Sequence, residues 1–78
     1  MEVNLKRRDG NNNTQFKTVD LSVLPAIGEK VIMVMEGERD EKIFKVLDVH
    51  HNLAKSHIDL ILEYHGLASV ITKEHIYM

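Results

Sequence analysis

The sequence predicts a mainly β fold, a small single-domain barrel of about five to six antiparallel strands, and three observations support this prediction. Residues 2–8 alternate between polar and apolar side chains, as a half-buried strand does. Residues 9–13 are Asp, Gly and three Asn, which together form the densest turn signal in the chain. At Pro25 and Gly28 the chain turns a corner into residues 31–36, which are apolar on both faces for most of their length.

The length of the chain limits it to one domain. Its 78 residues leave no room for a second core, so we assign residues 1–78 to a single unit. A domain of this size buries only about 60% of the surface that its unfolded chain exposes, and its stability is therefore expected to be modest. Association would bury more surface, which makes a homo-oligomer a reasonable expectation.

The composition indicates the location and the kind of partner. The chain has no cysteine, so disulfides and thiolate metal sites are excluded and a reducing cytoplasm is the expected location. The first residues lack the apolar core of a signal peptide, and no apolar run approaches the ~20 residues that cross a bilayer, so no membrane partner is expected. The net charge of -2, with acids and bases interspersed, disfavours nucleic acid as a partner.

The remaining strands follow from the same signals. Residues 14–21 are expected to complete the first hairpin, and the charged residues 37–42 to form a loop tip. Residues 43–49 are the next strand, in which the apolar pattern changes phase between Val46 and Leu47, as a β-bulge or sharp bend requires. Bent strands of this kind close small barrels.

Residues 52–66 fit two structures. Alternating apolar side chains, with Ile and Tyr among them, favour a strand at about residues 57–65. The alternative is an α+β fold with a helix at about residues 52–65, ended by Gly66. Residues 67–78 carry enough apolar side chains for a short closing strand or a turn of helix.

Five histidines in so short a chain raise the question of a metal site. His50 and His51 point to opposite faces of an extended chain, and no metal-binding spacing such as His-Glu-x-x-His is present. We expect solvated or hydrogen-bonded histidines, and we predict no metal ion and no other cofactor. If residues 57–65 form a strand, its exposed face carries His57, Asp59, Ile61, Glu63 and His65.

No arrangement of residues indicates catalysis. The serines lie in no nucleophile motif, and a barrel of this size has no room for a deep cavity. The acidic residues between positions 36 and 41 cluster at a loop tip, which they are expected to keep solvated. We therefore predict that the protein is not an enzyme and has no catalytic residues.

The one basic run is Lys6-Arg7-Arg8, which lies opposite Lys17 across the predicted hairpin. Three adjacent cations in a strand divide between its two faces. We interpret them as a charged edge strand that resists pairing with another sheet. The alternative is a small patch in which Lys6, Arg7, Arg8 and Lys17 contact phosphate groups.

An apolar surface is the best indication of a partner at the level of single residues. Met33 and Met35 occupy one face of the central strand and are expected to fill the core. If the barrel is incomplete, Ile32 and Val34 on the opposite face are exposed, and an apolar patch of that size typically marks an interface. Ile61, on the predicted exposed face of the later strand, is a third candidate for a partner surface.

Two segments resemble small Src-homology-3-type barrels. One is the corner Leu24-Pro25-Ala26-Ile27-Gly28-Glu29-Lys30-Val31 with its following hairpin, and the other is Lys45-Val46-Leu47-Asp48-Val49-His50-His51. Within residues 20–65 they are similar to short bacterial or phage proteins in which a Pro-x-x-Gly-acidic-x-Val corner leads to a Val-x-x-Val-x-His strand end. The resemblance implies an SH3-like β-barrel and a prokaryotic origin but no activity, because such barrels host many unrelated functions. The aromatic cluster with which such barrels bind proline-rich or methylated peptides is absent.

These observations predict a non-enzymatic interaction module that binds a protein partner, or itself, through a sheet edge or an exposed apolar face. The alternative is an accessory nucleic-acid-binding protein that uses the basic hairpin patch on phosphates. The two hypotheses differ in salt dependence, because phosphate binding weakens steeply with salt and an apolar interface does not.

Overall fold

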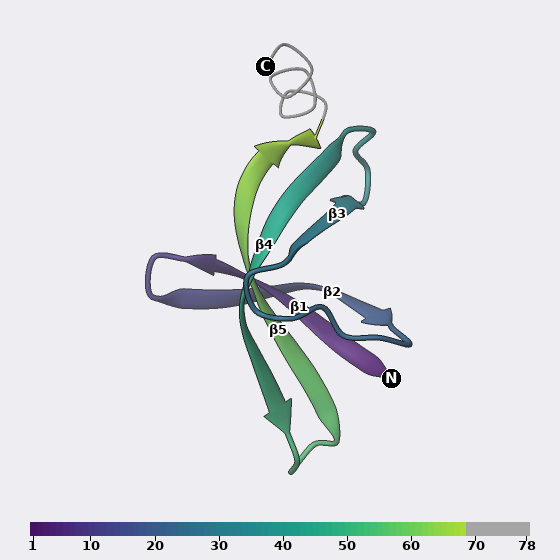
Figure 1. Cartoon of the computed structure of the whole chain (residues 1–78), viewed down its shortest axis with the longest axis vertical. Coiled ribbons are helices and arrows are strands. Elements are labelled where there is room, and N and C mark those ends of the chain that lie inside the picture. Colours follow the sequence, from purple (N-terminus) through teal and green to yellow (C-terminus); the bar gives the residue numbers. More distant parts are fainter. Residues whose placement is uncertain (69–78) are drawn as a thin grey trace.

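The computed structural model describes residues 1–68, and five β-strands account for most of them. The strands form one sheet in the order β2-β1-β5-β4-β3 (Figure 1). The prediction of a mainly β fold is therefore confirmed. In chain order the strands are β1 (Glu2–Asp9), β2 (Asn12–Asp20), β3 (Lys30–Val34), β4 (Glu41–Asn52) and β5 (His57–Leu67).

The segment that fitted two structures is a strand. β5 covers all of residues 57–65 and pairs with β4 in antiparallel orientation, from Asn52 opposite His57 to Lys42 opposite Leu67. The α+β alternative, with a helix at residues 52–65, is therefore wrong. A short closing strand or a turn of helix is also expected within residues 67–78. Beyond residue 68 this segment lies outside the described residues.

One pair of neighbouring strands runs parallel, so the prediction of an entirely antiparallel sheet is wrong at this pair. β1 pairs with β5 in parallel, with Val3 opposite Ile58 and Leu5 opposite Leu60, whereas β1 and β2 form an antiparallel hairpin. The alternation of apolar side chains is the same in parallel and antiparallel strands. The pattern therefore carries no information about strand direction.

The corner at Pro25 and Gly28 is a turn followed by a β-bulge. The Glu29 N–H donates to the Ala26 carbonyl oxygen at 3.1 Å, and Gly28 has a φ of 91°, as the third residue of a type II turn does. The Gly28 N–H donates to the Val46 carbonyl oxygen and the Val46 N–H donates to the Glu29 carbonyl oxygen, both at 2.8 Å. This is the pattern of a bulge with glycine at its first position, and it starts the pairing of β3 with β4.

β4 contains the second predicted irregularity. Its pairing with β5 shifts register between Val46 and Asp48, so Leu47 is an extra residue and the predicted change of phase is confirmed. Phe44 and Val49, on either side of the bulge, consequently face the same core although one has an even and the other an odd number.

The core lies on one face of the sheet, and the sheet stays open. Met33 and Met35 are half-buried and pack against the core, as predicted. β2 and β3 are the two edges of the sheet, and no pairing joins them within residues 1–68. Closure into a barrel therefore stays a prediction. The expectation of a central strand at residues 31–36 is wrong, because among these described residues β3 pairs on one side only, with β4. The centre of the core consists of Val3, Leu5, Phe44, Val46, Leu60 and Leu62.

Candidate functional site

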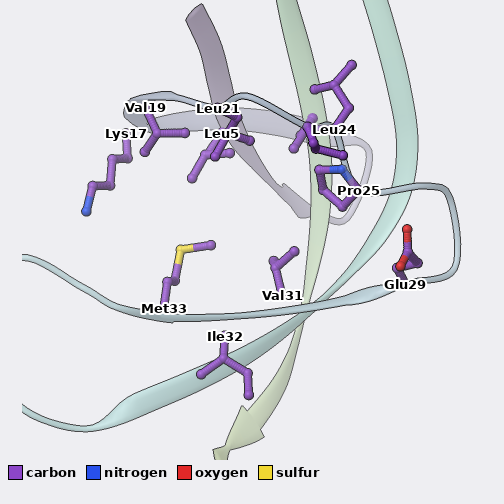
Figure 2. Close-up of a pocket in the computed structure, with 12 residues that line it drawn as sticks. Leu5, Lys17, Val19, Leu21, Leu24, Pro25, Glu29, Val31, Ile32 and Met33 are labelled. Atoms are coloured by element: carbon purple, nitrogen blue, oxygen red, sulfur yellow. The ribbon is translucent and has the colours of Figure 1, made fainter. Parts of the chain in front are cut away.

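An apolar groove lies between the two edges of the sheet (Figure 2). It has a volume of about 530 Å³ and is bounded by β2, by β3 and by the connection of residues 21–29 that joins these strands. Among the described residues that line it, only Lys17 and Glu29 carry a charge. The lining consists of Leu5, Lys17, Val19, Leu21, Val23, Leu24, Pro25, Glu29, Val31, Ile32, Met33 and Leu60.

Strand alternation explains why the groove is apolar. Val31 and Met33 of β3 extend toward the side occupied by Val19 of β2, and Figure 2 shows Ile32 on the other side of the strand. Leu60, a central core residue, also lines the groove. In the groove the core therefore reaches the surface, because no strand within residues 1–68 closes the sheet between its edges.

The connection between β2 and β3 supplies lining residues that the sequence did not assign to a site. Leu21 and Leu24 are half-buried and pack against the core, while Val23 is 77% exposed. Apolar side chains are concentrated in residues 21–25, which is unusual for a surface connection and is the signal that could have identified them. The pattern alone does not show which strands these side chains face.

The two charged residues of the groove do not form a catalytic pair. Figure 2 shows Lys17 and Glu29 at opposite sides of the view, on β2 and before β3. The Glu29 carboxylate accepts a hydrogen bond from the Ala26 N–H, which helps to hold the turn at the corner. The arrangement is suited to binding apolar side chains, with one charge of each sign at the rim.

The outer face of β3 carries exposed apolar side chains. Ile32 is 57% exposed and Val34 is 42% exposed. This is the exposure expected for an incomplete barrel, and the role of these residues in binding a partner stays a prediction.

Ile61 is buried, so its predicted place on an exposed surface is wrong. It is 1% exposed and lies in register between Lys6 of β1 and Asp48 of β4. The Lys6 ammonium reaches Oδ2 of Asp59 at 3.2 Å, so the aliphatic stem of Lys6 follows this face of the sheet. Polar residues at alternate positions of β5 therefore do not indicate that Ile61 is exposed, because Asp59, which is one of them, is itself buried.

Asp59 is the centre of a buried polar network on the same outer face. Its Oδ1 accepts a hydrogen bond from Nδ2 of Asn4 at 3.2 Å, and Oδ1 of Asn4 accepts one from the Thr18 hydroxyl at 2.9 Å. Burial raises the pKa of Asp59, but the hydrogen bonds from Asn4 and Lys6 and the nearby charges of Lys6 and His57 outweigh burial and hold the pKa below its ordinary value. The network joins β1, β2 and β5.

The four cations predicted as a phosphate patch extend from two faces of the sheet. Lys6 and Arg8 extend from the outer face, where Lys6 is held by a carboxylate of β5. Arg7 and Lys17 extend from the core face, where Arg7 lies 5.3 Å from the centroid of an aromatic ring and Lys17 lines the groove. In addition, β1 lies between β2 and β5, so the interpretation of its basic run as protection of a sheet edge is wrong.

Three histidines pair with a carboxylate two residues away on the same strand. The hydrogen bond from His50 is the main cause that lowers the pKa of Asp48. Within residues 1–68, no three His, Asp or Glu side chains gather closely enough to hold a metal ion. The distances from Nε2 to the nearest carboxylate oxygen are 2.9 Å for His50 and Asp48, 2.9 Å for His65 and Glu63, and 3.3 Å for His57 and Asp59.

Comparisons with known proteins find no matching family model, no matching curated protein and no matching solved structure. Among the described residues, no helix is long and apolar enough to cross a membrane. Function is therefore inferred from the groove, the sheet edges and the charges around them.

Proposed function

We propose that this chain is a non-enzymatic interaction module that binds an extended segment of a protein along the open edge of β3. The observation that carries the proposal is that β3 lies directly beside the apolar groove and that its edge away from β4 pairs with no strand within residues 1–68. A segment added to β3 gains backbone hydrogen bonds from the strand, while its alternate side chains enter the groove.

The direction of the backbone groups of β3 supports this mode of binding. The Val46 N–H donates to the Glu29 carbonyl oxygen at the start of the ladder between β3 and β4. In an antiparallel pair, every second residue of a strand forms its backbone hydrogen bonds with the same neighbouring strand. Because Glu29 bonds to β4, the odd-numbered residues of β3 direct their backbone N–H and C=O groups toward β4. Lys30, Ile32 and Val34 therefore direct their N–H and C=O groups outward, where an added strand can pair with them.

The two edges of the sheet differ in how well they resist pairing. β2 is mostly polar, and its register with β1 shifts between Leu5 and Lys6, which makes Phe16 an extra residue. Polar side chains and bulges are features by which edge strands avoid association. Residues 31–34 of β3 contain no charge, no proline and no bulge. β3 is therefore the edge suited to a partner.

The proposal also includes a cytoplasmic location and an SH3-like barrel that is left open at the edge of β3. The corner bulge and the bend in β4 support the barrel, because small barrels turn their strands by such bulges. The absence of cysteine supports the location. Nucleic-acid binding has less support, since the four candidate cations extend from two faces.

Selection from a library of random displayed peptides tests the proposed function. Wild-type protein is expected to enrich peptides with apolar residues at alternate positions. The substitution Ile32→Pro removes an outward N–H that no described strand uses, so it is expected to abolish peptide binding while the circular dichroism spectrum is retained. The matched control is Leu53→Lys, at a position that is 88% exposed in the connection between β4 and β5.

Two outcomes would contradict the proposal. Failure of a wild-type protein that is monomeric under the conditions of selection to enrich any peptide would remove the peptide-binding function. Equal affinity of a selected peptide for wild type and for Ile32→Pro would show that the edge of β3 is not the binding element.

A further inference from the structure

We infer that the extended segment bound by β3 is β3 of a second copy of this chain, in antiparallel orientation. The inference rests on the proposed function, because it names the occupant of the same edge. It is carried by the self-complementary order of charged and apolar residues from Lys30 to Glu36.

Backbone geometry allows few registers for two copies of β3 related by a two-fold axis. The backbone N–H and C=O groups that point away from β4 belong to the even-numbered residues of β3. When two copies pair along this edge, an even-numbered residue therefore lies opposite an even-numbered residue of the second copy. Axes at Ile32 and at Met33 both satisfy this condition. An axis at Met33 places Ile32 opposite Val34 and Lys30 opposite Glu36 of the second copy. An axis at Ile32 instead places Lys30 opposite Val34, which has no charge to attract the Lys30 ammonium.

Charge complementarity favours the axis at Met33. Lys30 lies opposite Lys45 of β4, so two like charges are neighbours on the outer face of the sheet. Glu36 is exposed just beyond the end of β3, in the turn closed by the hydrogen bond from the Glu38 N–H to the Met35 carbonyl oxygen. β3 ends at Val34, so Glu36 of the second copy lies beyond the paired residues, and its carboxylate reaches the open side of Lys30 from the turn. The symmetry makes this contact twice.

The same register covers the apolar surface of β3. On the outer face, Ile32 and Val34 of each copy, 57% and 42% exposed, lie opposite Val34 and Ile32 of the other. On the groove side, the half-buried Met33 meets its symmetry mate and Val31 lies opposite Met35. The charged pairs then flank an apolar centre, which is the usual arrangement of a specific interface.

Exchange of the two charges tests the pairing and its register by sedimentation equilibrium. Lys30→Glu and Glu36→Lys each convert both attractive contacts into repulsive ones, so each is expected to raise the dimer dissociation constant by about tenfold or more. The double variant Lys30→Glu/Glu36→Lys is expected to return the dissociation constant to about the wild-type value. Ile32→Lys is expected to abolish the dimer, and the control Leu53→Lys to leave it unchanged.

The single variant Lys30→Glu also separates dimer loss from unfolding. It replaces a repulsive contact with Lys45 by an attractive one within the monomer, so the monomer is not expected to lose stability. Urea denaturation of the monomeric variant measures this directly.

The outcomes distinguish the inference from the function on which it rests. A wild-type protein that is monomeric at its highest soluble concentration overturns the inference, and if it binds selected peptides the proposed function stands. A dimer that persists in Ile32→Lys, or that is not restored in the double variant, also overturns the inference. A wild type that neither dimerises nor enriches peptides contradicts both.

Discussion

Asp59 shows how a single buried carboxylate is retained in a small sheet. A charge removed from water is costly unless it is paired and hydrogen-bonded. Asn4 donates to one oxygen of Asp59 and Lys6 to the other, each at 3.2 Å. Within residues 1–68 no buried side-chain nitrogen or oxygen lacks a hydrogen-bond partner, so removing the carboxylate would leave its neighbours unsatisfied.

The substitution Asp59→Asn is expected to lower the unfolding free energy by about 1–3 kcal/mol at pH near 7. Because the folded-state pKa of Asp59 is depressed, its stabilisation is fully present above the unfolded value of about 3.9 and is lost as the pH falls through the folded pKa. Urea denaturation of both proteins at neutral and acid pH measures the difference, which should shrink in acid.

Other carboxylates do not complicate this comparison. Asp48 also has a lowered pKa, mainly through its hydrogen bond with His50, and it titrates in the wild type and the variant alike. A stability difference between the two proteins that stays constant from neutral pH to acid would show that the charge of Asp59 is not its source.

The corner before β3 depends on the conformation of one glycine. Gly28 has a φ of 91°, and a Cβ added there would meet no atom within 4 Å, so the cost of a side chain is conformational and not steric. Gly28→Ala is expected to lower the unfolding free energy by about 1–2 kcal/mol. The control Ile27→Ala, in the same turn and 63% exposed, should change it by less than about 0.5 kcal/mol.

Chemical denaturation measures both variants. Equal stability of Gly28→Ala and wild type would show that the turn does not require a positive φ. A smaller loss of stability in Gly28→Asn than in Gly28→Ala would support the requirement for a positive φ, because asparagine adopts left-handed conformations more readily than alanine.

The strands and their bends could be predicted because side-chain alternation records which face of a strand is buried. The shift at Leu47 was visible for the same reason, since a bulge changes the phase of the pattern. Pairing direction was not visible, because the parallel partners β1 and β5 alternate as antiparallel strands would. The strand order was hidden too, and with it the interior position of the basic run at residues 6–8.

The candidate site was predictable only in part. The exposure of Ile32 and Val34 followed from a strand that is apolar on both faces. The groove could not be predicted from the sequence, because it is formed by residues from separate strands and from the connection at residues 21–25, which meet only in the folded sheet. Ile61 was misjudged because its neighbours in the sheet, Lys6 of β1 and Asp48 of β4, are distant in sequence.

At the scale of the whole molecule, the open sheet and the short chain have the same consequence. Within residues 1–68 few side chains are buried to offset the loss of conformational entropy on folding, and part of the core reaches solvent through the groove. Pairing of two copies along β3 would add strand hydrogen bonds and cover apolar surface without a longer chain. Self-association would then contribute to folding as well as to function.

This coupling predicts that the wild-type melting temperature rises with protein concentration. A higher concentration favours the dimer of folded chains by mass action, whereas unfolded chains do not dimerise. Each kcal/mol gained would raise the melting temperature by about 4–8 °C in a domain of this size. Lys30→Glu should remove the concentration dependence and Lys30→Glu/Glu36→Lys should restore it, which scanning calorimetry over a roughly hundredfold concentration range measures. A wild-type melting temperature that is independent of concentration would mean that the monomer core alone supports the fold, and that the edge of β3 is open to other partners.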